Sequence, residues 1–229
     1  MGSYEDDVRT LEVELGRLEQ AFGDLTDEQW QTPTKLQPLD ETKPHWTVFE
    51  LAGHFDISIG LTLMLMAEPQ SGQVGRDRTS FFIFPRSEVA PVVYDYAYKM
   101  VEGKTPQQMP DVLRETFTNT IQGARTMAPD TVGPGYYALM RLDEFVPSQV
   151  VEAVVHGLDL TDAIGREPIA TPEGVAVTAG DPRRPARPQD GRRPAIGPHR
   201  RPGLGASCVR KGRACRPSAA AYRMTWTFS

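Results

Sequence analysis

Cysteine is nearly absent from this chain of 229 residues, and its two copies are Cys208 and Cys215. Residues 1–178 contain none, so this stretch can form no disulfide and offers no thiol nucleophile of its own. Any thiol chemistry carried out there would have to come from a cofactor. The two cysteines and His199 lie in a region with no expected scaffold, which makes them poor metal ligands.

Long apolar runs are also absent. No stretch of roughly 18 or more consecutive apolar residues occurs, and the N-terminus lacks the basic-then-apolar pattern of a secretory signal. These absences predict a protein without a membrane partner, and cytoplasmic residence is the default expectation.

Positive charge is scarce in most of the chain and concentrated at its end. Residues 179–229 contain 12 Lys and Arg against 2 Asp, whereas residues 1–178 contain 13 basic and 28 acidic residues. The overall net charge of −5 therefore conceals a net charge of −15 over residues 1–178. Such an acidic surface argues against nucleic acid or an anionic membrane as the partner.

The composition changes abruptly at Ala179. In GDPRRPARPQDGRRPAIGPHRRPGLG the apolar periodicity vanishes, which is typical of a disordered basic tail. A change of reading frame in a GC-rich gene is the second explanation: one choice of codons for residues 181–193, shifted by one nucleotide, encodes Ile-Leu-Asp-Asp-Leu-Leu-Ala-Arg-Arg-Thr-Val-Ala. We favour the frame change, because ordered globular sequence seldom breaks so sharply. Either way, we predict a folded domain over residues 1–178 and an irregular tail over 179–229.

Helical patterns dominate the predicted domain. Residues 4–22 have acidic residues on one face and an apolar stripe on the other, made of Leu11, Leu15, Leu18 and Phe22. TVFE at residues 47–50 is a capping box that opens a helix running to about Ala67. The second half of that helix is apolar on nearly every side, so we expect it to be central.

Three further helices follow in the pattern. One begins near Ser87, has Pro91 in its first turn and ends at Gly103. Another follows a capping box at 105–108, begins late because of Pro110, and carries the stripe Leu113, Phe117 and Ile121. The last begins within 143–147 and ends at Gly165. A short extended piece is expected at SFFIFP and one strand near 128–142, so the fold is predicted to be all-α, a helical bundle with long inter-helix loops.

A candidate site comes from VVEAVVHGLDL at residues 150–160. On a helix, the spacing of Glu152 and His156 places both side chains on one face, one turn apart. Their polar groups need partners in such an apolar stretch, because unpaired burial costs several kcal/mol. His54 lies on the core-facing side of the central helix, beside Leu51 and Phe55.

A His/Glu/His set from two helices is the ligand pattern of a catalytic metal site with open positions. Zinc suits it best, and nickel, cobalt or ferrous iron also fit. The competing interpretation is that a Glu-x3-His pair arose by chance and is solvated or internally hydrogen-bonded. Asp159 either solvates the helix end or holds a ligand histidine, and His45 is expected in a surface loop.

Two segments resemble the mycothiol-dependent maleylpyruvate isomerase family: DEQWQTPT…HWTVFELAGHF and, much later, RLDEFVPSQVVEAVVHGLDLTDAIGR. They contain the elements Trp-Thr-x3-Leu-Ala-x-His and Glu-x3-His-Gly-x-Asp-Leu in order. The resemblance extends from residue 4 to about 178. It implies the DinB/YfiT-like superfamily of metal-binding four-helix bundles and an actinobacterial source.

The resemblance also implies a ligand set and a chemistry. The family's metal ligands match His54, Glu152 and His156, and the metal is usually zinc. A metal-bound low-molecular-weight thiol, mycothiol, would be the cofactor. Its thiolate would attack a small electrophile, which leads to addition, to displacement of a leaving group, or to isomerisation. The family's isomerase has a C-terminal domain that supplies an arginine near its active site, and this chain has the irregular tail in that place.

Three functions are therefore compared. The first is a metal- and mycothiol-dependent isomerase or S-transferase, and the second is a non-catalytic metal-binding bundle that has lost the catalytic C-terminal portion. The third and weakest is nucleic-acid binding through the basic tail, for which no base-reading element is apparent. We expect a monomer or a homodimer.

Overall fold

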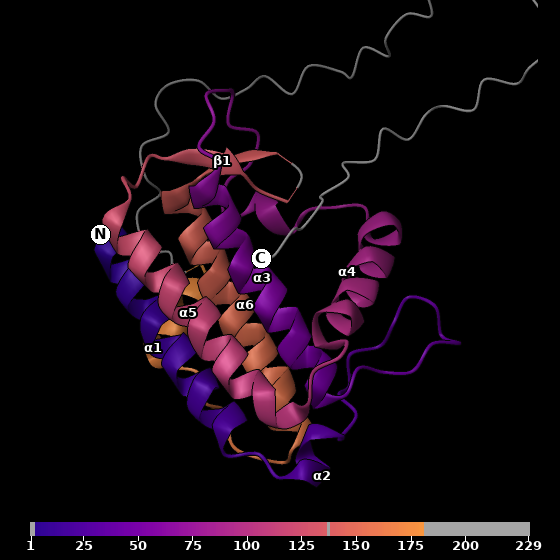
Figure 1. Cartoon of the computed structure of the whole chain (residues 1–229). Coiled ribbons are helices and arrows are strands. Elements are labelled where there is room, and N and C mark those ends of the chain that lie inside the picture. Colours follow the sequence, from indigo (N-terminus) through magenta and orange to yellow (C-terminus); the bar gives the residue numbers. More distant parts are fainter. Residues whose placement is uncertain (1–2, 137, 181–229) are drawn as a thin grey trace, which may run out of the picture. The chain divides into compact units, whose positions relative to one another are not determined.

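The structure is a computed structural model that describes residues 3–136 and 138–180. All described elements belong to one compact unit. In chain order the elements are α1 Tyr4–Gly23, α2 Asp27–Trp30, α3 Val48–Ala67, η1 Ser80–Phe82, α4 Arg86–Val101, η2 Pro106–Gln108, α5 Met109–Thr126, β1 Val132–Pro134, β2 Leu139–Arg141, α6 Leu142–Ala163 and α7 Pro172–Thr178 (Figure 1).

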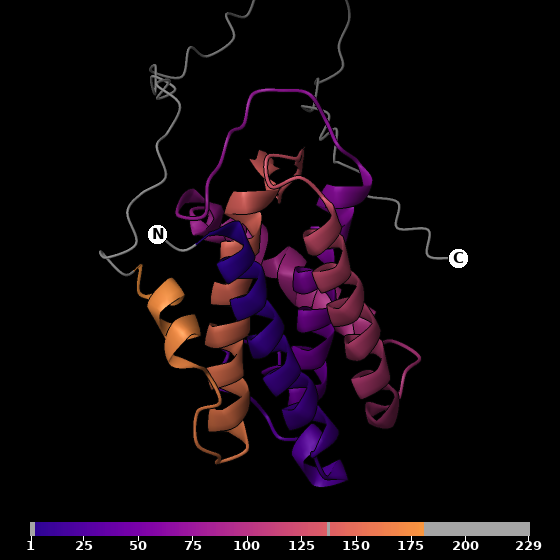
Figure 2. The same cartoon turned by 90° about the vertical axis from the view of Figure 1, so that its left-hand side faces the viewer.

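Four long helices form the bundle. Helix α1 packs against α5 and α6, and α3 packs against the same two helices on the other side (Figures 1 and 2). Helix α4 packs against α3 and lies outside the four. The predicted all-α class and the four-helix bundle are confirmed, with α4 as an addition.

Helix α1 forms as its pattern predicts. Ser3 and Asp6 make a capping box at its start, which satisfies backbone N–H groups that have no partner within the helix. The apolar stripe is fully buried in the bundle: Leu11, Leu15, Leu18 and Phe22. Burial of each such side chain contributes about 1.5–3 kcal/mol, so this stripe holds α1 in place.

Helix α3 is the central element. The capping box of Thr47 and Glu50 is present, and the helix ends at Ala67 as expected. By length and composition α3 could cross a membrane, with a mean hydropathy of 1.4, but 72% of that window is buried inside the protein. Its apolar character is therefore explained by contacts with α4, α5 and α6.

The segment before α4 differs from the prediction. SFFIFP contains the 3₁₀ turn η1 and no strand, because the Asp77 carboxylate accepts hydrogen bonds from the backbone N–H groups of Thr79 and Ser80. Helix α4 begins at Arg86, which places Pro91 in the second turn, where the sequence analysis expected it in the first. The capping box at 105–108 forms around η2, and α5 begins at Met109, late as predicted.

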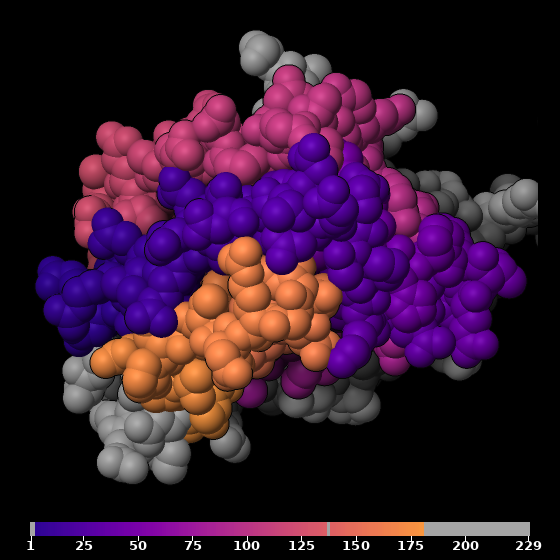
Figure 3. Space-filling model, turned by 90° about the horizontal axis from the view of Figure 1, so that it is seen from below, coloured from indigo at the N-terminus to yellow at the C-terminus, as the bar shows by residue number. Residues whose placement is uncertain are grey.

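Three short elements were not predicted. The segment before α6 holds two antiparallel strands, where one was expected. Helix α2 is a single capped turn. Helix α7 packs on α6 and α1 (Figure 2), and in Figure 3 the orange C-terminal part of the described chain lies against the indigo N-terminal part. The buried Glu14 carboxylate of α1 accepts hydrogen bonds from the backbone N–H and the hydroxyl of Thr171, the α7 N-cap.

The predicted tail of 179–229 lies outside the described residues from 181 onward. Its cysteines, His199 and the proposed frame change therefore stay sequence predictions. The boundary between 178 and 179 also stays a prediction, and α7 ends at Thr178.

Candidate metal centre

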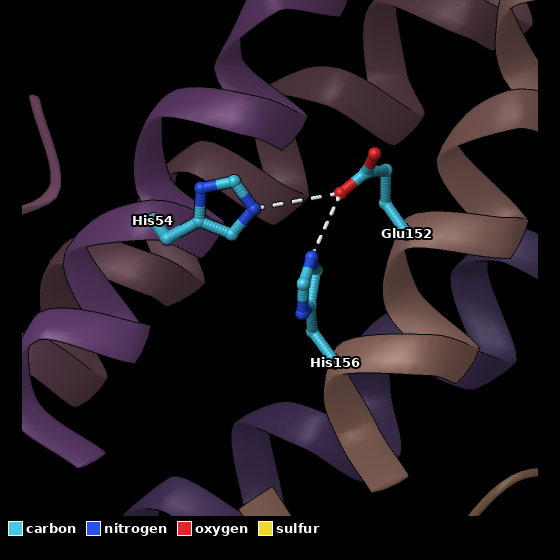
Figure 4. A group of neighbouring side chains, drawn as sticks. All are labelled: His54, Glu152 and His156. Atoms are coloured by element: carbon cyan, nitrogen blue, oxygen red, sulfur yellow. Dashed lines mark ion pairs between the residues drawn. The ribbon is translucent and has the colours of Figure 1, made fainter. Parts of the chain in front are cut away.

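Helices α3 and α6 bring the three predicted ligands to one point. His54 projects from α3, and Glu152 and His156 project from α6 one turn apart (Figure 4). One ligand atom from each of these side chains lies within 4.8 Å of the others. Among the described residues, this is the one group of three or more His, Cys, Asp or Glu side chains arranged to hold a metal ion.

A single carboxylate oxygen lies between the two imidazoles. Glu152 Oε2 is 3.5 Å from His54 Nε2 and 3.3 Å from His156 Nε2. The two imidazole rings meet edge to face, with centroids 4.6 Å apart. A metal bonds to such ligands at about 2.0–2.2 Å, so an ion between these three atoms would need only small side-chain movements.

Several polar atoms of the cluster lack hydrogen-bond partners. Both ring nitrogens of His54 and Oε2 of Glu152 are buried, and no described residue forms a hydrogen bond with them. An unsatisfied buried polar group costs about 1–3 kcal/mol. A cation between His54 Nε2 and Glu152 Oε2 would remove most of this cost. The donor set, two imidazoles and one carboxylate, is therefore a good fit for a divalent metal such as zinc.

His156 differs from His54 in having a second partner. Its Nδ1 lies 2.8 Å from Asp159 Oδ2. Of the two roles weighed for Asp159, contact with a ligand histidine is the one found in the structure. Asp162, one turn further along α6, instead pairs with Lys35 at 2.8 Å.

The charges of the metal-free cluster follow from burial and proximity. Burial lowers the pKa of His54, so its imidazole is neutral. Burial opposes ionisation of Glu152, but the two adjacent imidazoles outweigh it and hold its pKa well below the usual range. Burial also opposes the charged form of His156, but Asp159 and Glu152 outweigh it and raise its pKa to about 9. A metal ion would replace the proton on His156 Nε2.

Aromatic rings form the apolar wall of the cluster. The Trp46 ring lies 5.2 Å from His54 and stacks on Tyr94, and the Phe55 ring lies 6.1 Å from His156. The Trp46 indole N–H is buried and has no hydrogen-bond partner among the described residues. Trp46 lies within one of the two family-like segments, and no role for it was predicted. The available signal was its position directly before the Thr47 cap, which places it beside the first turn of α3.

The remaining candidates lie outside the cluster. His45 is exposed in the loop before α3, as predicted, and its Nδ1 contacts the Thr34 carbonyl. Arg141 pairs with Asp143 at 2.8 Å.

Comparison with known proteins identifies a family. The family model described as mycothiol maleylpyruvate isomerase N-terminal domain matches residues 11–161, a range that contains all three predicted ligands and Asp159. No curated protein and no solved structure matches the chain significantly. The match covers more than half of the chain and ends within the last turn of α6. The chain therefore belongs to the mycothiol maleylpyruvate isomerase N-terminal domain family.

Proposed function

We propose that this protein is a metal-dependent enzyme that activates mycothiol for addition to, or isomerisation of, a small electrophilic substrate. The observation that carries the proposal is the cluster of buried His54 with half-buried Glu152 and His156, within a chain of this family. His54, Glu152 and His156 would hold the ion, and we propose zinc. When bound, such an ion supplies Lewis-acid stabilisation of a thiolate at neutral pH.

The chain's own residues favour this role in two ways. Three protein ligands leave at least one coordination position open for a small molecule, which is the arrangement of catalytic zinc sites. The rings of Trp46 and Phe55 beside the ligands exclude water and strengthen electrostatic interactions at the cluster. Residues 1–178 contain no cysteine, so a thiol that reacts there is brought by a cofactor.

The test is thiol consumption by the zinc-loaded full chain with mycothiol and a panel of electrophiles: epoxides, quinones, Michael acceptors and maleylpyruvate. We expect consumption of mycothiol with at least one class, and loss of that activity in Glu152→Gln. His45→Ala is the matched control, because His45 is an exposed histidine outside the cluster. No consumption with any member of the panel would contradict the proposal.

The second candidate is a non-catalytic metal-binding bundle. It is favoured by one observation: the family match ends at residue 161 and corresponds to an N-terminal domain alone. Thermal unfolding separates the two candidates. A binding bundle would be stabilised by zinc but not further by mycothiol, whereas the proposed enzyme would show an additional shift with the thiol.

A further inference from the structure

Asp159 has a position on α6 that helix electrostatics alone do not favour. It lies close to the C-terminal end of the helix, which ends at Ala163 and has no basic residue in its last turn. The partial negative charge at a helix C-terminus disfavours a carboxylate there. Nearby Asp162 offsets this cost by pairing with Lys35, and Asp159 does so by contacting His156 at 2.8 Å.

This contact decides which nitrogen of His156 faces the cluster. The two ring nitrogens of histidine are distinct, and the partner of one determines the role of the other. With Nδ1 donating to Asp159 Oδ2, the Nε2 atom is left to face Glu152 Oε2, 3.3 Å away (Figure 4). Nε2 is therefore the atom that would bind a metal, in exchange for its proton.

We propose that Asp159 is a positioning residue, which holds His156 in the tautomer and ring orientation needed for metal binding through Nε2. The inference rests on the proposed metal site and adds to it a residue outside the ligand set. A carboxylate behind a metal-bound imidazole also increases the basicity of the ligand, and its loss typically reduces metal affinity 10–100-fold.

The two histidines of the cluster are unequal in this respect. Nδ1 of His54 is buried and has no hydrogen-bond partner among the described residues, and the ring rests against Trp46. The carboxylate support is therefore specific to the α6 side of the site. Helix α6 supplies two ligands and the residue that orients one of them, and α3 supplies a single ligand held by packing.

The test compares the zinc affinity of the full chain with those of Asp159→Ala, Asp159→Asn and Asp162→Asn, by competition with a chromophoric chelator. Asp159→Ala removes both the hydrogen-bond acceptor and the charge, so we expect about a 10–100-fold loss of affinity. Asp159→Asn keeps an acceptor oxygen without the charge, so its loss should be smaller. Asp162→Asn is the matched control on the same helix and should bind zinc like the unchanged chain.

A second readout separates positioning from a general structural role. Long-range ¹H–¹⁵N correlation spectra of the zinc-loaded protein report which ring nitrogen carries the proton. We expect a protonated Nδ1 and a metal-bound Nε2 at His156 in the unchanged chain, and an altered Nδ1 signal in Asp159→Ala. Circular dichroism of the metal-free variants checks that the helices are intact.

The outcomes distinguish this inference from the proposed function. If the unchanged chain binds zinc and Asp159→Ala binds it equally well with the same spectrum, the positioning role is wrong and the metal site stands. If the unchanged chain binds no zinc, both the metal site and the positioning role are wrong. If zinc binds and Asp159 matters but mycothiol is not consumed, the positioning role stands and the enzyme proposal fails.

Discussion

At the scale of single residues, the cluster is a balance between burial and charge. Glu152 is 15% exposed at its side chain, His156 18% and His54 10%. Without a metal, the proton on His156 neutralises Glu152, and His54 remains neutral because it is desolvated. The opposite charges of Glu152 and His156 therefore offset part of the cost of burying the cluster. The Nε2 atoms of both histidines stay directed toward Glu152 Oε2.

Removal of one ligand should abolish metal retention. We predict that His156→Ala purified from zinc-supplemented cells contains far less than one zinc ion per chain, because two protein ligands bind too weakly to survive purification. Elemental analysis measures the content, and His45→Ala should match the unchanged chain. Equal zinc content in His156→Ala and the unchanged chain would contradict the ligand assignment.

At the scale of elements, α3 matters because it serves both the bundle and the site. Its first turns carry His54, and its residue Gly53 allows the close approach of α4. A Cβ atom added at Gly53 would lie 2.5 Å from the Ala97 carbonyl oxygen and 2.8 Å from Val101 Cγ1. The α4 backbone cannot yield as a flexible side chain can, so the spacing of α3 and α4 depends on this glycine.

We predict that Gly53→Ala lowers the melting temperature relative to Gly60→Ala. Gly60 is the matched control on the same helix, because its added Cβ would meet only Thr116 Cγ2, at an ordinary 3.8 Å. Overpacking costs about 1–3 kcal/mol, which corresponds to a difference of about 2–12 °C between the two variants. Differential scanning calorimetry measures it, and equal melting temperatures would show that α4 adjusts without cost.

At the scale of the whole molecule, a metal at the cluster would link two helices that are distant in the chain. α3 and α6 are separated by the loop with η1, by α4, by α5 and by the hairpin of β1 and β2. An ion bound to the native state alone stabilises it by about 2.7 kcal/mol when its free concentration is about 100 times Kd. The free energy of unfolding of the entire bundle would rise by this amount.

We predict a zinc-dependent rise in melting temperature of about 5–11 °C for the metal-free protein under those conditions. The rise should be absent in His156→Ala, because the linkage requires binding at the cluster. Scanning calorimetry with and without zinc measures both. A similar rise in the variant would place the stabilising ion at another site.

The predicted domain boundary, between residues 178 and 179, can also be tested on the whole molecule. All three proposed ligands precede residue 160, and α7, whose N-cap Thr171 is hydrogen-bonded to Glu14, ends before residue 180. We therefore predict that a chain ending at Gly180 retains the zinc content and the melting temperature of the full chain. Loss of zinc on truncation would mean that residues 181–229 contribute to the site.

The sequence by itself determined the long helices, the capping box of α3 and the three residues predicted as metal ligands. These features are local: the apolar stripe of α1, the Thr47 and Glu50 cap, and the i,i+4 spacing of Glu152 and His156 depend on residues within a few turns. His54 joined this pair through its place on the core-facing side of the predicted central helix, and the family resemblance pointed to the same three residues. Helix periodicity and capping depend on residues that are close in the chain, so both can be predicted from the sequence.

Only the tertiary structure decided the distances across helices. The approach of His54 to Glu152, the stacking of Trp46 on His54, and the docking of α7 through Glu14 and Thr171 join residues far apart in the chain. The choice between solvation and histidine contact for Asp159 also needed side-chain geometry, because the spacing of three residues on a helix permits both. Packing selects among such arrangements, and no local pattern encodes packing.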